Sequence, residues 1–123
     1  MCGIVGIVSN KSVSESIISA LKKLEYRGYD SAGISTISKG QINEKKCSGR
    51  VDNLEKILFK NPSKGSLGIG HVRWATHGTP SQINAHPHSS EEVSVVNAVP
   101  STLKYISFSC CQSSVFPELP KLK

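Results

Sequence analysis

The sequence is poor in aromatic residues and contains no long apolar run. Only 6% of its 123 residues are aromatic and 37% are hydrophobic, below the roughly 45–50% typical of globular domains. No run approaches the ~18 apolar residues that a membrane-spanning helix needs. The N-terminus also lacks the basic and apolar regions of a signal peptide. We therefore expect a single globular domain with no membrane partner.

Acidic residues are also scarce. Nine Asp and Glu stand against fifteen Lys and Arg, which gives a net charge of +6. Such a balance can draw a protein to phosphates. Twelve of the cations are lysines, however, and the longest clusters are the pairs at 22–23 and 45–46. Nucleic-acid-binding proteins usually carry a clustered basic face with stacking aromatics, so we expect no nucleic-acid partner.

Disulfide and metal motifs are missing as well. The four cysteines show no C-x-x-C spacing, and adjacent Cys110 and Cys111 are a poor frame for a structural disulfide. Free thiols in a reducing compartment are therefore expected. His86 and His88 form a possible ligand pair, but no Cys, Asp or Glu stands near them at ligand spacing. We expect no metal, and we assign the histidines to loop-ordering hydrogen bonds.

Apolar periodicity predicts the order β, α, β, β, α, β in the first 72 residues. A capping box at Ser12–Glu15 starts the first helix, and the polar second hairpin strand is expected near a sheet edge. The predicted elements are a strand at 2–8, a helix at 13–24, hairpin strands at 32–38 and 41–47, a helix at 51–58 and a strand at 66–72. Residues 73–90 are predicted to form a loop and residues 93–96 a strand. Beyond Asn97 the apolar residues follow neither the helical nor the strand period.

Cys2 directly follows the initiator Met, so removal of Met1 would place a thiol and a free α-amine on one residue. In short peptides an α-amine titrates near about 8 and a thiol near about 8.5, so the amine can accept the thiol's proton. One residue then supplies both nucleophile and base, as in N-terminal-nucleophile enzymes. A small buried residue at the start of a strand is the alternative interpretation.

Arg73 and Trp74 follow the strand predicted at 66–72. A guanidinium offers a planar fork that matches a substrate carboxylate, although Arg73 could equally be a surface cation or a partner for Asp30. Trp74 can cover a pocket or anchor a core. In the dense turn at 25–33, a pair between Arg27 and Asp30 would fix the connection between helix and strand.

Four blocks of the sequence closely resemble one enzyme family. They are Met-Cys-Gly-Ile-Val-Gly-Ile at 1–7, Leu-Glu-Tyr-Arg-Gly-Tyr-Asp-Ser-Ala-Gly at 24–33, Gly-Ile-Gly-His-Val-Arg-Trp-Ala-Thr-His-Gly at 68–78 and Asn-Ala-His-Pro-His at 84–88. In order and spacing they resemble glucosamine-6-phosphate synthase, also called glutamine–fructose-6-phosphate aminotransferase (isomerizing). The Cys2 start alone is shared with other class II glutamine amidotransferases.

The resemblance implies an α+β fold, the αββα four-layer sandwich of N-terminal-nucleophile (Ntn) hydrolases, here truncated. It implies that Cys2, after loss of Met1, attacks the side-chain amide of L-glutamine. Water would then hydrolyse the glutamyl thioester, and ammonia would serve glucosamine 6-phosphate synthesis. No cofactor is implied, and the family together with the lack of a signal indicates the cytoplasm.

The resemblance also implies roles for six further residues. Arg73 matches the arginine that holds the glutamine α-carboxylate, and Trp74 matches the tryptophan that gates an ammonia channel. The remaining matches are Thr76 and His77, which line the glutamine pocket, and Arg27 and His86, which order the site.

The resemblance covers residues 1 to about 96 and then stops. Where the family continues His-Asn-Gly, whose Asn side chain and Gly amide form the oxyanion hole, this chain has Asn97-Ala98-Val99-Pro100. No oxyanion hole is recognisable, and losing one donor typically costs about 100- to 1,000-fold in rate. We expect residues 1–96 to be the N-terminal part of a glutaminase domain and 97–123 a divergent, irregular tail. We also expect this sequence to lack the isomerase half that would bind fructose 6-phosphate.

The abrupt change near residue 97 is typical of a frameshift, a retained intron or a misplaced end of a reading frame. Translation of the other two frames from the codon of Val93 tests this hypothesis. Two alternatives stay open beside a weakly active or inactive glutaminase. One is a non-catalytic glutamine-binding fragment or pseudo-enzyme, and the other is a small basic binding protein.

Overall fold

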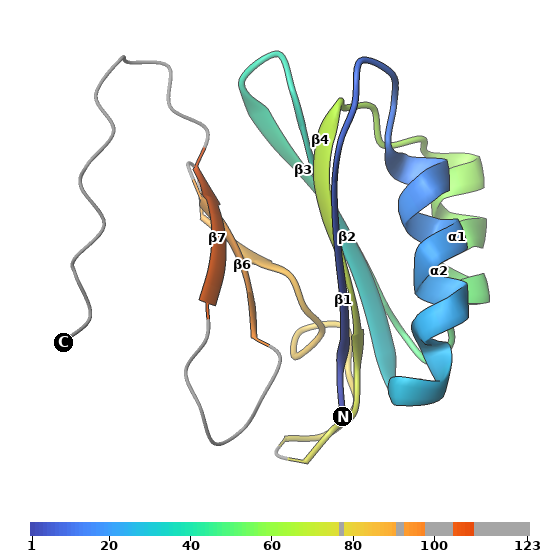
Figure 1. Ribbon diagram of the computed structural model, residues 1–123. Helices are drawn as coiled ribbons and strands as arrows, with labels where there is room; N and C mark the ends of the chain where they lie inside the picture. Colours follow the sequence, from blue (N-terminus) through green and yellow to red (C-terminus); the bar gives the residue numbers. More distant parts are fainter. Residues whose placement is uncertain (77, 91–92, 98–104, 110–123) are drawn as a thin grey trace, which may run out of the picture.

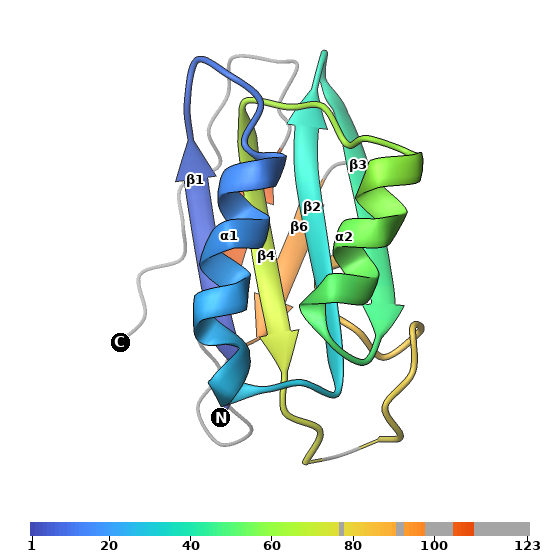
Figure 2. The ribbon, with the colours of Figure 1, turned by 90° about the vertical axis from the view of Figure 1, so that its right-hand side faces the viewer.

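The computed structural model describes residues 1–76, 78–90, 93–97 and 105–109. Two helices cover one face of a four-stranded antiparallel sheet, and a smaller sheet lies on the opposite face (Figures 1 and 2). The large sheet has the strand order β1-β4-β2-β3 and the small one the order β5-β6-β7. Helix, sheet and second sheet thus follow one another as layers of an α+β fold.

The predicted order of strands and helices is confirmed, with small shifts in their bounds. Lys39 and Gly40, both at positive φ, form the tight turn between the two hairpin strands. The elements are β1 (Gly3–Val8), α1 (Ser14–Leu24), a 3₁₀ turn η1 (Glu25–Arg27), β2 (Ser31–Ser38), β3 (Gln41–Ser48), α2 (Val51–Lys60), β4 (Leu67–Arg73), β5 (His88–Ser89), β6 (Val93–Asn97) and β7 (Tyr105–Ser109). The polar strand β3 lies at an edge, as expected.

The start of α1 corrects the predicted capping box. Val13 occupies the N-cap position, and no side chain caps the helix there. The Ser14 hydroxyl instead donates to the Ser63 carbonyl, and the Ser63 and Thr36 hydroxyls lie 2.7 Å apart. Ser14 thus belongs to a buried cluster whose hydroxyls bond to protein groups because no water reaches them. Ser12, the predicted cap, is exposed and lies one residue before the N-cap position.

Strand β7 corrects, for residues 105–109, the expectation of an irregular tail over 97–123. Residues 105–109 pair antiparallel with β6, with Tyr105 opposite Asn97 and Ser109 opposite Val93. Its sequence, Tyr-Ile-Ser-Phe-Ser, alternates apolar and polar residues from Ile106 onward, which is the period of a strand. The signal spans five residues between stretches without a period, and the sequence analysis missed it.

The apolar core lies between the helices and the large sheet. Ile17 and Leu21 of α1 and Leu54 of α2 are fully buried against Ile34 of β2 and Val72 of β4. Each such side chain contributes about 1.5–3 kcal/mol when it leaves water. The core therefore fixes the strands of the sheet, and with them the ends of the strands, relative to one another.

Strand register brings the candidate residues together at one end of the sheet. In the antiparallel pairing of β1 with β4, Gly3 lies opposite Val72, so Cys2 precedes β1 where β4 ends. In the pairing of β2 with β4, Ser31 lies opposite Arg73, so Asp30 stands at the same end. Cys2, Asp30 and Trp74 are therefore neighbours, although long stretches of sequence separate them.

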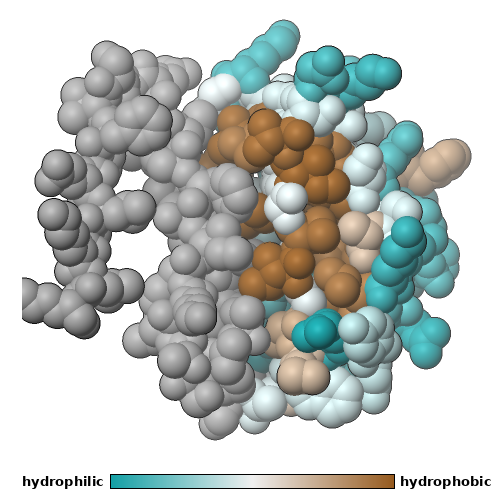
Figure 3. Space-filling view, viewed as in Figure 1, coloured by the Kyte–Doolittle hydropathy of each residue, from teal (hydrophilic) through white to brown (hydrophobic). Residues whose placement is uncertain are grey.

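β1 is an edge strand of apolar sequence, Gly-Ile-Val-Gly-Ile-Val. Figure 3 shows hydrophobic residues along this side of the molecule. Val8 is 77% exposed, and Ile4 and Ile7 are half-buried. Exposed edges without charge or proline are templates for pairing with another chain, so we expect this chain to self-associate through β1.

Val8→Lys tests that expectation. Burial of one valine is worth about 1.5 kcal/mol or more, which corresponds to about a tenfold change in association constant. The variant should therefore need about tenfold higher concentration to associate, as measured by sedimentation velocity. Ile83→Lys is the matched control, because Ile83 is equally exposed but lies in a loop. Equal association of the two variants would show that β1 is not the contact.

Candidate active site

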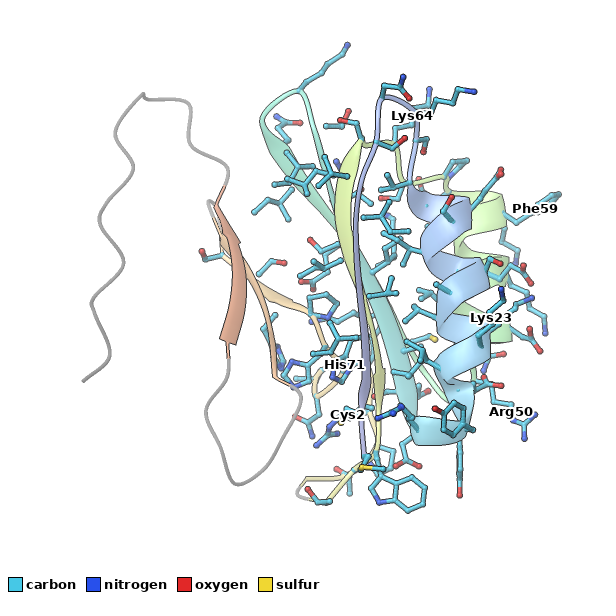
Figure 4. All side chains as sticks on the ribbon, in the orientation of Figure 1. Cys2, Lys23, Arg50, Phe59, Lys64 and His71 are labelled. Atoms are coloured by element: carbon cyan, nitrogen blue, oxygen red, sulfur yellow. The ribbon has the colours of Figure 1, made fainter. Side chains whose placement is uncertain are left out.

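The thiol of Cys2 faces the backbone of Trp74. The Trp74 amide nitrogen lies 3.5 Å from Cys2 Sγ, and the Trp74 carbonyl oxygen lies 4.0 Å from it. Cys2 is half-buried and directly precedes β1. Figure 4 shows it at the end of the sheet where the chain begins. The thiol is therefore held by main-chain groups of a segment 72 residues away, while one side of it stays open to solvent.

Asp30 and Arg27 do not pair as the sequence suggested. The Asp30 carboxylate accepts a hydrogen bond from the Ala75 amide at 2.7 Å. Arg27 Nε donates to the Tyr26 hydroxyl at 3.1 Å, and its guanidinium lies 5.5 Å from the centre of the Tyr26 ring. Each of the two side chains is thus bonded to a different partner. Sequence reasoning missed the contact between Asp30 and Ala75.

Trp74 lies at the surface of the site, 41% exposed, and is not a core anchor. Its ring meets Tyr29 edge to face, with the ring centres 5.5 Å apart and the planes at 77°. Tyr29 is itself 48% exposed. The two rings form an aromatic wall next to Cys2, the position that a cover over a pocket would need.

Arg73 ends β4 and is half-buried. A Cβ built on Gly78 would lie 3.7 Å from Nη2 of Arg73, so the guanidinium reaches the loop that follows Trp74. Thr76 is exposed in that loop. His77, the other residue predicted to line the pocket, lies outside the described residues, as do residues 98–100 and the pair Cys110 and Cys111.

Three histidines stack on the face of the large sheet that lies toward β6. His71 is fully buried, its ring 4.8 Å from that of His86, which lies 4.5 Å from that of His88 (Figure 4 labels His71). Partial burial lowers the pKa of His88, and the nearby Lys46 lowers it further. Within the described part of the chain, no three His, Cys, Asp or Glu side chains are placed to hold a metal ion.

Gly33 lets the histidine segment approach the sheet. A Cβ built on Gly33 would lie 2.1 Å from the carbonyl oxygen of His86, a distance that no side chain can occupy. Gly33 also lies opposite His71 in the pairing of β2 with β4. His86 is thus placed by backbone contact against β2 and by ring contact with His71.

A groove of about 890 Å³ lies elsewhere, between α1 and α2. Its lining includes Ile18 and Lys22 of α1, Leu58 and Phe59 of α2, and Lys64. In Figure 4 Phe59 and Lys64 lie on the helix side of the sheet, away from Cys2. The groove carries no thiol and no imidazole, so the candidate site stays at Cys2.

No helix in the described ranges combines the length and apolarity required to cross a bilayer.

Curated relatives match most of this chain. Glutamine–fructose-6-phosphate aminotransferase (isomerizing) of Rhizobium meliloti is 56% identical over 97 residues, which cover 79% of this chain and 16% of the relative. The enzymes of that name from Clostridium acetobutylicum and Brucella abortus are 56% identical over 99 residues and 52% identical over 97. Each match again covers 79% of this chain and 16% of the relative. This chain is related to the glutamine–fructose-6-phosphate aminotransferases. It spans about a sixth of their length. No family model matches it.

A solved structure confirms the fold that the resemblance implied. Glutamine phosphoribosylpyrophosphate amidotransferase from B. subtilis, complexed with ADP and GMP, superposes with a TM-score of 0.59 at 25% identity. The match covers 77% of this chain and 20% of that chain. The α+β fold is thus that of the Ntn hydrolases, of which the described residues form a helix layer and two sheets.

Proposed function

We propose that this chain carries the glutamine site of a glutamine–fructose-6-phosphate aminotransferase, with Cys2 as the nucleophile. The observation that supports this most strongly is the position of the Cys2 thiol. It lies directly before β1, in contact with the Trp74 backbone and at the end of the sheet where Arg73 and Asp30 stand. The identity of 52–56% to the aminotransferases supports the same assignment.

The chemistry follows from a thiol beside an α-amine. Once Met1 is removed, the α-amine of Cys2 takes the thiol's proton and Sγ attacks the side-chain carbonyl carbon of L-glutamine. A sulfur–carbon bond forms, and the carbon–nitrogen bond breaks as the amine returns the proton to the leaving nitrogen, which departs as ammonia. Water then attacks the thioester, releases glutamate and restores the thiol.

Neighbouring side chains would bind and enclose the glutamine. The Arg73 guanidinium would pair with its α-carboxylate, and Trp74 would gate the ammonia, while Thr76 and His77 would line the pocket. Arg27 would order the turn beside the site, and His86 would order the loop that faces β2. In the whole aminotransferase the ammonia would pass to fructose 6-phosphate in the isomerase half.

A glutamine-binding protein without turnover is the second candidate. The residues that follow Val96 do not repeat the Asn-Gly pair expected of an oxyanion hole, and β6 ends at Asn97. Without those donors the tetrahedral intermediate would lack its stabilising hydrogen bonds. Binding of glutamine without measurable release of glutamate would favour this candidate over the glutaminase.

Protection of Cys2 by glutamine tests the proposed function. In a chain with Cys110→Ser and Cys111→Ser, two thiols remain, Cys2 and Cys47. Cys47 is 6% exposed, and burial raises the pKa of its thiol, so iodoacetamide should alkylate Cys2 first. L-glutamine should slow that reaction several-fold and D-glutamine should not, as peptide mass spectrometry would show. Equal rates with and without L-glutamine would contradict the proposal.

A further inference from the structure

The turn that precedes β2 forms hydrogen bonds with the segment that carries Trp74. The Asp30 amide donates to the Arg73 carbonyl at 3.2 Å, and the Ala75 amide donates to Asp30 Oδ2 at 2.7 Å. The Asp30 carbonyl in turn accepts from the Gly49 amide at 2.8 Å. Asp30 therefore bonds to the residues on both sides of Trp74 and is itself tied to the end of β3.

Gly28 brings the same turn into direct contact with the Trp74 peptide. A Cβ built on Gly28 would lie 2.5 Å from the carbonyl carbon of Arg73, 2.6 Å from its oxygen and 2.7 Å from the Trp74 nitrogen. All three are backbone atoms, which cannot turn aside as the end of a side chain would. The absent side chain is what allows the two segments to touch.

The two peptide groups that Asp30 holds are the ones that face the Cys2 thiol. The Trp74 nitrogen, 3.5 Å from Cys2 Sγ, belongs to the peptide between Arg73 and Trp74, and the Trp74 carbonyl belongs to the next peptide. Asp30 fixes both, because it bonds the carbonyl of the first and the amide of the second. Hydrogen bonds to an ionised carboxylate are shorter and stronger than neutral ones.

We propose that Asp30 is a positioning residue for Cys2, acting through the Arg73–Ala75 backbone, with Gly28 providing the space. This inference rests on the proposed function of Cys2. The hydrogen bonds of Asp30 go to backbone groups of Arg73, Ala75 and Gly49 and not to the thiol. The backbone amide of Asp30 holds the Arg73–Trp74 peptide and its carboxylate holds the Trp74–Ala75 peptide. Together they set the place where Sγ meets the glutamine amide and where Arg73 and Trp74 leave the strand.

Three variants in the Cys110→Ser, Cys111→Ser chain test the proposal. Asp30→Ala leaves the Ala75 amide without its acceptor, and an unsatisfied amide is costly. The L-glutamine concentration that half-protects Cys2 should therefore rise about tenfold or more. Asp30→Asn keeps an oxygen that can accept from Ala75 and should stay much closer to the unaltered protein. Asp52→Ala removes an exposed acid of α2 and serves as the control.

A second measurement tests the hydrogen bonds of Asp30 to Arg73 and Ala75 separately from glutamine binding. Hydrogen exchange at the Ala75 amide should speed up in Asp30→Ala, stay slow in Asp30→Asn and be unchanged in Asp52→Ala. If the unaltered chain shows no glutamine protection but the exchange pattern holds, the proposed function fails, while the hydrogen bond from the Ala75 amide to Asp30 is supported. If protection exists and Asp30→Ala leaves it unchanged, or if Asp30→Asn fails as badly as Asp30→Ala, the positioning proposal is overturned.

Discussion

Gly33→Ala is expected to destabilise this protein by about 2–3 kcal/mol, because overpacking that forces the backbone to move costs that much. The new Cβ would lie 2.1 Å from the carbonyl oxygen of His86, so the segment carrying His86 and His88 must withdraw from β2. The core between the helices and the large sheet does not depend on that contact. We therefore expect the histidine segment to separate while the first sheet stays folded.

Urea unfolding and amide exchange together measure this effect. The free energy of unfolding should fall, and exchange should accelerate at residues 84–89 more than in β1, β2 and β4. Gly6→Ala is the matched control, because Gly6 is an exposed glycine of β1. A Gly33→Ala protein as stable as the control, with unchanged exchange at 84–89, would show that the two segments do not meet as described.

Arg73→Gln is expected to weaken the binding of L-glutamine about 10- to 100-fold, as measured by protection of Cys2 from alkylation. A hydrogen bond to a charged group is worth about 1.5–3 kcal/mol, and each 1.4 kcal/mol changes affinity tenfold. Arg73 ends β4 two positions after the buried His71, so the strand itself places its guanidinium at the site. Glutamine keeps the length and polarity of the side chain while it removes the charged fork.

A ligand without the carboxylate makes the test specific. 4-Aminobutanamide has the side-chain amide of glutamine but no α-carboxylate, so Arg73→Gln should leave its weak protection unchanged. Arg50→Gln, at the exposed start of α2, is the protein control. Equal losses for both ligands would mean that Arg73 supports the fold of the site and does not read the carboxylate.

The sequence predicted the elements well where a period runs over many residues. The apolar spacing of Ile17, Ile18 and Leu21 marks α1, and the Lys39-Gly40 turn marks the hairpin. The capping box was wrong because α1 begins one residue later than a Ser12 cap requires, with Val13 at the N-cap and the Ser14 hydroxyl bonded to Ser63, 49 residues away. No local pattern records such a contact. β7 was missed because its alternation is only five residues long.

The sequence names candidate site residues but not the contacts between them. Cys2, Arg73 and Trp74 stand out by residue type and by resemblance, and the sheet register brings them together. The Asp30–Ala75 bond had no sequence signal, because a backbone amide can belong to any residue and 45 positions separate the two. The sequence instead favoured Arg27 as the partner of Asp30 on the grounds of charge and closeness along the chain.

Covalent labelling of Cys2 tests the central claim most directly. The probe is a glutamine analogue that carries a diazoketone in place of the side-chain amide, and intact-mass and peptide mass spectrometry locate the adduct. We expect one adduct, on Cys2 of chains that have lost Met1, prevented by L-glutamine and absent from Cys2→Ala. Labelling that L-glutamine does not prevent, or that falls equally on Cys47, would contradict a glutamine site built around Cys2.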